Sequence, residues 1–352
     1  MFFLKKSKGV LGLDIGTSSV KMVELVETKK GYQLKNFGYS SLPKETIVNG
    51  VLKNPSALIT AITNLARSLK PSTKYVATSI SGHPVIIKKI ITSVVDETEL
   101  EESIRFEAEQ YIPFDIEEVN IDYQILGVNE ANPEQMEVLL VAAKKSLINE
   151  YVEVIQDAGL EPVIVDIDSF ALENAYEFNY SDEKMPVVAL IDMGAGVINI
   201  NVVKEGKSSF SRDIFMGGNK LSEEIQRHLK VSEEEAEILK RGGESDQIDY
   251  EQLDKIVREI SLTLAKEIQR SLDLYAASSE KEEVKKIYLT GGTSQILGFK
   301  ELINERVGIP VEFLDPFREI KFNEAQFDPE YIKEIKPIAA VGVGLALRKL
   351  QD

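Results

Sequence analysis

The chain has 352 residues, a formal net charge of −17 and no cysteine. The acidic balance excludes general nucleic-acid binding, because neutralising phosphates requires clustered Lys and Arg. The lack of cysteine excludes a disulfide framework, a zinc–thiolate site, an iron–sulfur cluster and a cysteine nucleophile. No apolar run reaches the roughly 18 residues of a membrane span, and residues 1–8 do not have the pattern of a secretory signal. We therefore expect a cytoplasmic protein of about two domains.

The first predicted elements are a strand, a turn and a second strand over residues 9–26. The apolar first strand runs into Asp14-Ile-Gly16, hydroxyl residues follow, and a β-branched strand comes next. A further strand over 32–39 completes a β-meander.

Residues 187–203 repeat this design around Asp192, and a strand over 208–215 again completes a meander. The two copies lie about half the chain apart, which is too long a period for a solenoid. The repeat indicates two related lobes.

The other elements follow from cap residues and apolar periodicity. The predicted N-caps are hydroxyl residues: Thr98 (with Glu101), Ser146, Ser169 and Ser232 (with Glu235). In chain order the predicted helices cover 55–69, 98–112, 146–158, 169–178, 232–241, 252–276 and 337–350, and strands cover 160–165 and 286–289.

A segment over 78–158 has a character of its own, with strands over 85–95, 119–126 and 137–143 around the helix that begins at Thr98. It is predicted to be a subdomain inserted into the first lobe.

The turn after Asp14 has the composition of a phosphate-binding loop. Gly16 and the hydroxyl residues Thr17, Ser18 and Ser19 can aim donors at a phosphate, and Asp14 can hold Mg²⁺ directly or through water. Lys21 follows in the next strand. An ordinary hairpin with Gly16 at positive φ explains one copy equally well.

The second copy favours the phosphate interpretation. Asp192 precedes Gly194-Ala195-Gly196, which has no bulky side chain. A third turn, Gly291-Gly292-Thr293-Ser294, follows a strand and opens a helix, which lets the backbone approach a ligand. It is the expected place for the adenosine and the α-phosphate.

The order of these motifs resembles the actin-like ATPase superfamily. Within that superfamily, the chain resembles the PilM family of type IV pilus assembly proteins. The segments that carry this resemblance are 11–24, 106–114, 167–172, 217–221 and 267–275.

The resemblance implies an α/β, actin-like (ribonuclease H-like) duplicated fold with a nucleotide cleft between two lobes and an inserted 1C subdomain. The implied division is 1–79 (1A), 80–158 (1C), 159–185 (connect-1), 186–220 (2A), 221–276 (2B), 277–336 (2A) and 337–352 (connect-2).

The resemblance also assigns roles to single residues. Lys266, Glu267 and Arg270 match the position that frames the adenine, and Lys220 is similar; a solvated helix face is the alternative. Asp168 matches the acidic position that orients an attacking water, with Asp166 as a substitute; an N-cap or a salt bridge is the alternative.

The implied ligands are ATP and Mg²⁺, with Asp14 and Asp192 holding the metal through water. Whether the chain is an enzyme stays open, since at most slow ATP hydrolysis is implied. The implied partner is the cytoplasmic N-terminal peptide of PilN, which belongs to the PilN/PilO inner-membrane complex, and a surface around Tyr111–Phe114 is a candidate for it. Pilus motor ATPases and self-association are further possibilities. An FtsA-like filament protein and a small-molecule kinase are the alternatives.

Overall fold

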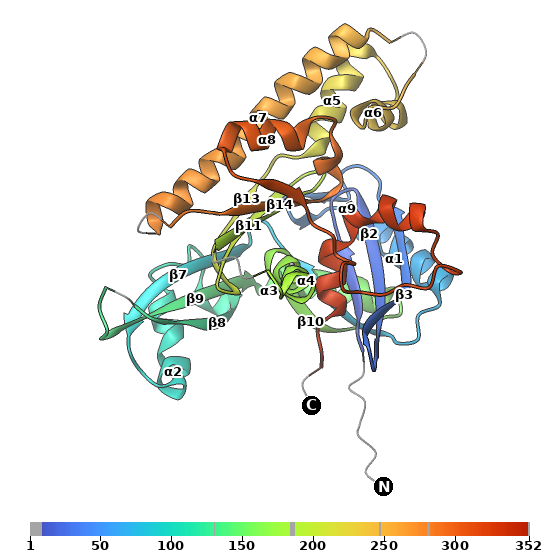
Figure 1. The fold of residues 1–352 in the computed structure, drawn as a ribbon. Helices are drawn as coiled ribbons and strands as arrows, with labels where there is room; N and C mark the ends of the chain where they lie inside the picture. Colours follow the sequence, from blue (N-terminus) through green and yellow to red (C-terminus); the bar gives the residue numbers. More distant parts are fainter. Residues whose placement is uncertain (1–8, 130, 184–186, 246–247, 280–281, 351–352) are drawn as a thin grey trace.

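The computed structural model describes residues 9–129, 131–183, 187–245, 248–279 and 282–350 (Figure 1). Residues 1–8, on which the expectation of a missing secretory signal rests, lie outside the described residues. Two five-stranded sheets form the framework of the fold. No helix in the described ranges is long and apolar enough to cross a membrane.

The first sheet has the strand order β10-β6-β1-β2-β3. The antiparallel meander consists of β1 (Leu11–Ile15), β2 (Ser19–Thr28) and β3 (Gly31–Ser41). Strands β6 (Tyr75–Ile80) and β10 (Glu161–Ile167) extend the sheet parallel to β1. All five residues of β1 are buried, as expected for a central strand with both faces covered.

The second sheet repeats this topology with the order β13-β12-β11-β14-β15. Its meander consists of β11 (Val187–Met193), β12 (Ile198–Lys204) and β13 (Lys207–Ile214). Strands β14 (Lys286–Thr290) and β15 (Val311–Phe313) run parallel to β11. The equal order confirms the two related lobes predicted from the sequence repeat.

Two helices lie between the sheets, α4 (Asp168–Tyr180) and α9 (Pro329–Ala346), and they contact each other as well as both meanders. Small residues allow the close packing. A Cβ atom on Gly12 would lie 2.0 Å from the carbonyl oxygen of Gly342, and one on Gly344 would lie 1.7 Å from that of Ala171. The glycines near the end of the chain therefore seat α9 against β1 and α4.

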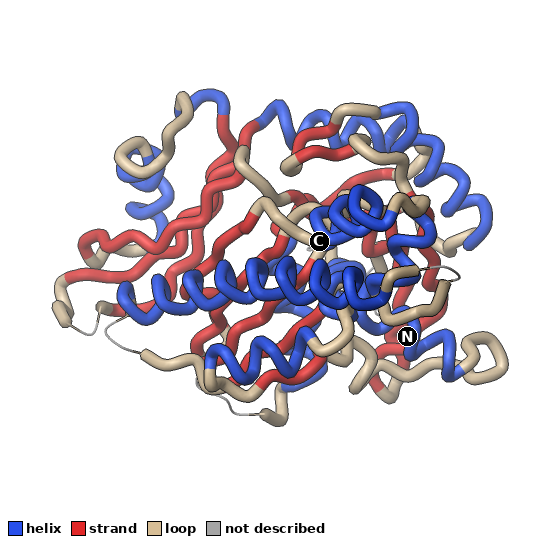
Figure 2. The backbone as a smooth tube through the Cα atoms, turned by 90° about the horizontal axis from the view of Figure 1, so that it is seen from above, coloured by secondary structure: helices blue, strands red, loops and turns tan. Residues whose placement is uncertain are grey.

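The remaining helices lie outside this central pair, and Figure 2 shows helices in blue in front of red strands. Helices α1 and α3 pack on the first lobe, while α5, α6, α7 and α8 belong to the second. Their bounds, with those of the short elements, are β4 (Ile47–Val48), β5 (Val51–Leu52), α1 (Pro55–Leu69), α3 (Lys145–Asp157), α5 (Gly218–Leu229), α6 (Glu233–Lys240), α7 (Tyr250–Ser278), η2 (Gly292–Gln295) and α8 (Phe299–Val307).

Between β6 and α3 the chain forms a third sheet with the order β7-β9-β8 (Figure 1). It is antiparallel and packs against α2 around its own apolar core, which includes Ile104 and Leu140. Its elements are β7 (Val85–Ser93), α2 (Glu97–Ala108), η1 (Ile116–Glu118), β8 (Val119–Val128) and β9 (Gln135–Lys144).

Several predicted helix ends differ from the structure. The N-cap of α2 is Asp96, whose side chain accepts from the Glu99 amide, so the capping box at Thr98 is wrong. Helix α3 starts after Lys144 without a side-chain cap, and Ser146 lies inside it. Helix α4 begins at Asp168, so Ser169 is not its cap either. The predicted cap at Ser232 is confirmed, because it accepts from the Glu235 amide.

Helix α9 begins at Pro329, two turns earlier than predicted, and Pro337 lies inside it. The sequence prediction used Pro337 as a helix start, because proline removes an amide donor and favours the first turn. Asp328 is the actual N-cap, since its side chain accepts from the Glu330 amide.

Candidate functional site

The first turn is built by the hairpin of β1 and β2. Asp14 and Lys21 face each other in the register of this pair. The Lys21 ammonium lies 3.1 Å from Asp14 Oδ2, and both side chains are largely buried. The Gly16 amide donates to the Ser19 carbonyl over 3.0 Å, which closes the turn.

The second turn has the same hydrogen-bonded construction but different side chains. Asp192 faces Asn199 across β11 and β12, so Asn199 takes the position that Lys21 has in the first lobe. The Gly194 amide donates to the Val197 carbonyl over 3.0 Å. The Asn199 side chain donates to Asp213 over 2.7 Å. The duplicated turns therefore share a single ammonium, that of Lys21.

The two turns meet directly. A Cβ atom on Gly196 would lie 2.9 Å from Thr17 Oγ1. On the other side of the second turn, the carbonyls of Gly194 and Ala195 accept from the Gly218 and Asn219 amides at 3.2 and 2.8 Å. The second turn is thus packed between the first turn and the start of α5, which leaves no room for larger side chains.

The third turn packs on the second. The Gly291 amide donates to the Pro337 carbonyl over 2.6 Å. Gly291 has φ +85°, and a Cβ atom there would lie 2.3 Å from Asp192 Oδ1. The Thr293 hydroxyl donates to the Gly194 carbonyl over 2.8 Å. The structure therefore brings together all three turns that the sequence singled out.

Three carboxylates surround the Lys21 ammonium. Burial, reinforced by the charge of Asp14, raises the pKa of Asp192 to about 7. Burial also raises the pKa of Asp168 to about 6. The pKa of Lys21 is raised because Asp14, Asp192 and Asp168 together outweigh the effect of its burial. Lys21 is thus held as a cation among acidic groups.

These donors fit a magnesium ion. Carboxylate oxygens suit Mg²⁺, which keeps several waters and takes only one or two protein carboxylates beside substrate phosphates. Within the described ranges, no group of three His, Cys, Asp or Glu residues has the geometry of a complete metal cage. Asp14 and Asp192, which lie near the ends of β1 and β11 at the two meeting turns, match this looser requirement of Mg²⁺.

The predicted adenine-framing residues lie elsewhere. Glu267 pairs with Arg212 of β13 over 3.7 Å, and Arg270 is 4.0 Å from Glu267. Neighbouring residues of β13 alternate between the two faces of the sheet. Asp213, which follows Arg212, therefore lies on the opposite face, where it accepts from the Gly82 amide. Lys266 is exposed on the same helix. The three α7 residues are therefore not brought to the turns.

Lys220 also points away, because its ammonium pairs with Glu224 one turn later on α5 over 3.0 Å. A different lysine lies beside the turns. Lys240 is 5% exposed, and its ammonium lies 2.7 Å from Glu237 and 3.0 Å from the Ser222 hydroxyl. A Cβ atom on Gly218 would lie 3.1 Å from the Lys240 ammonium and 2.4 Å from Thr293 Oγ1.

Sequence reasoning missed Lys240, although the sequence contained a signal for it. Ala236, Leu239 and Lys240 are the buried residues of α6. Their spacing is that of one apolar helix face, and a lysine on such a face is rarely buried without a specific partner.

The inserted sheet touches the second lobe along β13. The Gly82 amide donates to Asp213 over 2.9 Å. The His83 ring stacks on Phe215 with centroids 3.8 Å apart. A small pocket of about 230 Å³ lies between these two segments. At the far end, Lys207 donates to the Leu126 carbonyl over 2.9 Å. Strand β13 thus links the second turn to the insertion.

The repeated sheets and the meeting turns define an actin-like ATPase fold, and solved structures support this class. A structure described as a PilM–PilN type IV pilus biogenesis complex is similar over 97% of this chain and 99% of that chain, with TM-score 0.86 and 29% identity. The ethanolamine utilization protein EutJ from Carboxydothermus hydrogenoformans has TM-score 0.58 and 16% identity over 97% of this chain and 90% of its own, a likeness of fold alone.

The model of the family described as type IV pilus assembly protein PilM matches residues 12–350. The chain therefore belongs to the PilM family of actin-like pilus assembly proteins. It is also 26% identical to the cell division protein FtsA of Bacillus subtilis over 66% of this chain. The match spans only 57% of the length of that relative.

Proposed function

We propose that the chain binds ATP with Mg²⁺ between its two Asp-containing turns. The observation that carries this proposal is the direct approach of the turns at Thr17 and Gly196, which places two carboxylates and one ammonium around the same space. The net charge of −17 works against the binding of a polyphosphate. Backbone amides, hydroxyls and a bound cation would supply the attraction instead.

In this proposal each turn has a separate task. Asp14 and Asp192 would hold the metal, which neutralises phosphate charge when it is bound. The hydroxyls of the first turn (Thr17, Ser18 and Ser19) and the small residues of the second (Gly194, Ala195 and Gly196) would face the phosphates, with Lys21 between them.

The third turn, Gly291–Ser294, would face the nucleoside. We assign the polar contact beside it to Lys240 and Glu237, in preference to Lys266, Glu267 and Arg270. We prefer them because Lys240 lies next to Thr293 and Gly218. In contrast, Glu267 of α7 pairs with Arg212 on the other face of β13.

Asp168 is the proposed group for orienting a water. It lies at the first turn of α4, and its pKa of about 6 would allow it to accept a proton near neutral pH. This supports a slow hydrolysis step at most, because no second base accompanies it in the proposed roles.

Nucleotide protection against thermal unfolding tests the site. MgATP should raise the melting temperature of the wild type, since a ligand that binds only the folded state stabilises it. Asp14→Ala and Gly194→Val should abolish this rise, and Lys266→Met should retain it. An equal rise in Asp14→Ala would remove the assignment of the turns.

We further propose that the chain is a scaffold at the inner face of the cytoplasmic membrane that binds the cytoplasmic N-terminal peptide of PilN. Membership of the PilM family and the likeness to a PilM–PilN complex support this partner. The peptide would lie between the first-lobe core and the inserted sheet. The chain would then link the PilN/PilO platform to cytoplasmic pilus components.

The predicted peptide-binding surface around Tyr111–Phe114 is partly covered by other side chains of the chain. Ile112 is 6% exposed and belongs to the core of the insertion. Lys88 covers the Tyr111 ring at 4.7 Å, and Lys144 covers Phe114 at 4.3 Å. Ile112 is therefore removed as a candidate for contact with a peptide, and Tyr111, Pro113 and Phe114 remain.

A synthetic peptide of the PilN amino terminus tests the partner. It should be retained by the immobilised full chain, and a scrambled peptide should not. Failure to bind both with and without MgATP would refute the scaffold proposal. Because the nucleotide site is tested separately, each proposal can fail alone.

A further inference from the structure

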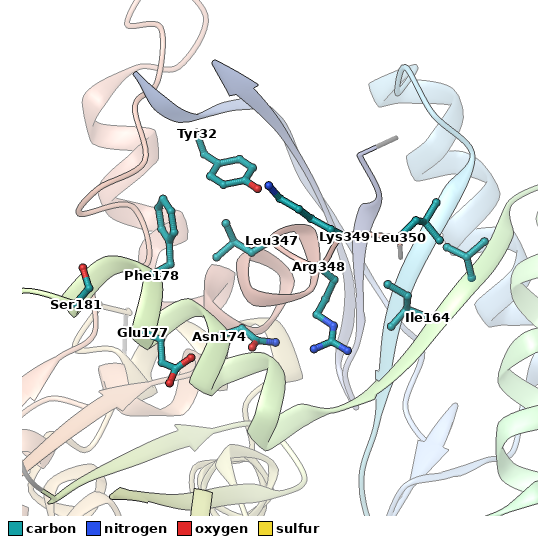
Figure 3. Close-up of a pocket in the computed structure, with 11 residues that line it drawn as sticks. Tyr32, Ile164, Asn174, Glu177, Phe178, Ser181, Leu347, Arg348, Lys349 and Leu350 are labelled. Atoms are coloured by element: carbon teal, nitrogen blue, oxygen red, sulfur yellow. The ribbon is translucent and has the colours of Figure 1, made fainter. Parts of the chain in front are cut away.

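A pocket with a volume of about 910 Å³ lies away from the three turns. Figure 3 shows it where residues 347–350 pass between α4 and the first sheet. Its walls come from β3, β10, α4 and the residues after α9. None of the turn residues is among the described residues that line it.

One end of the pocket is an apolar subsite. The rings of Tyr32 and Phe178 meet edge to face, with centroids 5.3 Å apart and an angle of 81°. Leu347 lies beside them, and Ile164 and Leu350 line the opposite side (Figure 3). Such a subsite fits an apolar side chain, because aromatic and aliphatic residues from separate elements form its walls.

The cations at the pocket are already paired. Arg348 Nε lies 3.4 Å from Asp166 Oδ2, and Lys349 lies 3.2 Å from Glu27. Glu177, in contrast, is exposed at the wall of the pocket and has no ion pair in the part of the chain that the structure describes. Partial burial raises the pKa of its carboxyl, and no cation offsets this rise.

A hydrogen-bond donor also lacks a partner there. The Asn174 Nδ2 atom is buried and donates to no described residue. An unsatisfied buried donor costs free energy, so a carbonyl group placed against it would be favourable. Asn174 and Glu177 lie about one turn apart on α4, on the same wall (Figure 3).

We infer that this pocket binds an extended segment of a partner protein in which an apolar residue stands next to a Lys or Arg. The apolar side chain would sit against Tyr32, Phe178 and Leu347. A rotation of the Asn174 side chain toward the pocket would let its amide donate to a backbone carbonyl of the segment, and the cation of the segment would pair with Glu177. This surface is distinct from the proposed nucleotide site and from the proposed PilN groove, and the inference does not depend on either.

The absence of cysteine makes a clean test available in the full chain. Ser181 lines the pocket and is exposed, so its replacement by cysteine gives one reactive thiol. The probes are the peptide amides acetyl-Leu-Phe-Leu-Lys and acetyl-Leu-Phe-Leu-Glu. The measurement is how each peptide slows alkylation of Ser181→Cys, with exposed Ser56→Cys on α1 as the control position.

We expect the lysine peptide to slow alkylation of Ser181→Cys but not of Ser56→Cys. It should bind about three- to tenfold more tightly than the glutamate peptide, the range of a partly exposed charged hydrogen bond. Glu177→Gln should remove this difference, and Glu153→Gln on α3 should preserve it. Melting temperatures identify any variant that fails to fold, and the wild-type comparison of the two peptides needs no Glu177 variant.

Other results would overturn the inference. Equal affinity for the two peptides, or a difference that survives Glu177→Gln, would exclude recognition by this carboxylate. Absence of protection by either peptide up to its solubility limit would exclude a peptide site. Protection without peptide that grows with protein concentration would indicate a second copy as the occupant. Protection that disappears when residues 1–8 are removed would indicate the amino-terminal segment of the chain itself.

Discussion

Thr17 of the first turn and Gly196 of the second lie so close that a methyl group on Gly196 would come 2.9 Å from the Thr17 hydroxyl oxygen. The contact joins the two lobes at the point where their repeated hairpins end. Gly196 is therefore required by the opposing turn.

Gly196→Ala should force the two turns apart and reduce the rise in melting temperature that MgATP produces. The double variant Thr17→Ala/Gly196→Ala should recover part of that rise, because it removes the atoms that the new methyl group meets. Differential scanning fluorimetry with and without MgATP measures both. A full rise in Gly196→Ala alone would show that the approach of the turns is unimportant for binding.

Lys21→Met should destabilise the free protein by roughly 3 kcal/mol at pH 8, because it leaves buried carboxylates without their cation. The loss should shrink at pH 5, since Asp192 and Asp168, with pKa values of about 7 and about 6, are then protonated. Urea unfolding at both values tests this. Lys35→Met is the control, because Lys35 pairs with Glu24 and is itself 40% exposed. Equal losses for Lys21→Met at pH 5 and pH 8 would contradict the charge cluster.

The two lobes could be predicted because each hairpin motif is local in the chain. The strand, the Asp-x-Gly turn and the second strand follow one another within about 18 residues of 9–26, and the repeat at 187–203 has the same pattern. Helix caps were harder to predict. Asp96 and Thr98 are both good cap residues, and the structure shows that the Asp96 side chain accepts from the Glu99 amide.

The partner of the third turn could not be predicted from spacing. Lys240 and Lys266 both lie on amphipathic helices with acidic neighbours. What separates them is which helix packs beside Thr293, and this depends on contacts between segments far apart in the sequence. The same holds for Pro337, whose carbonyl accepts from Gly291 and from the Thr290 hydroxyl. The third turn thus docks onto a helix that the sequence prediction started at Pro337 and that actually begins at Pro329.

Lys240→Met should weaken binding of MgATP about tenfold, because it removes a charged donor beside the proposed nucleoside position. It should leave the affinity for magnesium tripolyphosphate unchanged, since that ligand has no nucleoside. Lys266→Met should change neither affinity. Competition calorimetry with the two ligands makes the comparison. Equal weakening for both ligands would place Lys240 at the phosphates or in the structural core instead.

Glu173 provides a test of pH dependence. It accepts from Asn201 over 3.0 Å, and burial raises its pKa from 4.5 to about 7. The folded chain therefore keeps Glu173 protonated while the unfolded chain ionises, so its contribution to stability is complete below pH 4.5 and is lost as pH rises through 7.

Glu173→Gln should thus stabilise the chain at pH 8 by up to roughly 3 kcal/mol and have little effect at pH 4. Chemical unfolding at both pH values measures this, and Glu161→Gln at an exposed position is the control. A gain that does not depend on pH would show that folding does not raise the pKa of Glu173.

The stack of His83 on Phe215 should couple the insertion to the second lobe. A double-mutant cycle of His83→Ala and Phe215→Ala should give a coupling free energy of about 1 kcal/mol, as for packed ring pairs. The same cycle with His228→Ala, at an exposed position, instead of His83→Ala should give no coupling free energy. Additive effects of His83→Ala and Phe215→Ala would mean that the two rings do not interact in solution.

Hydrogen–deuterium exchange of the full chain with and without MgATP tests the nucleotide site most directly. The account predicts that MgATP slows amide exchange in both turns, residues 14–20 and 192–197, and in the third turn at 291–294. It predicts no change over residues 266–270. Protection of only one Asp-containing turn, or of neither, would contradict the claim that the two repeated turns bind the nucleotide together.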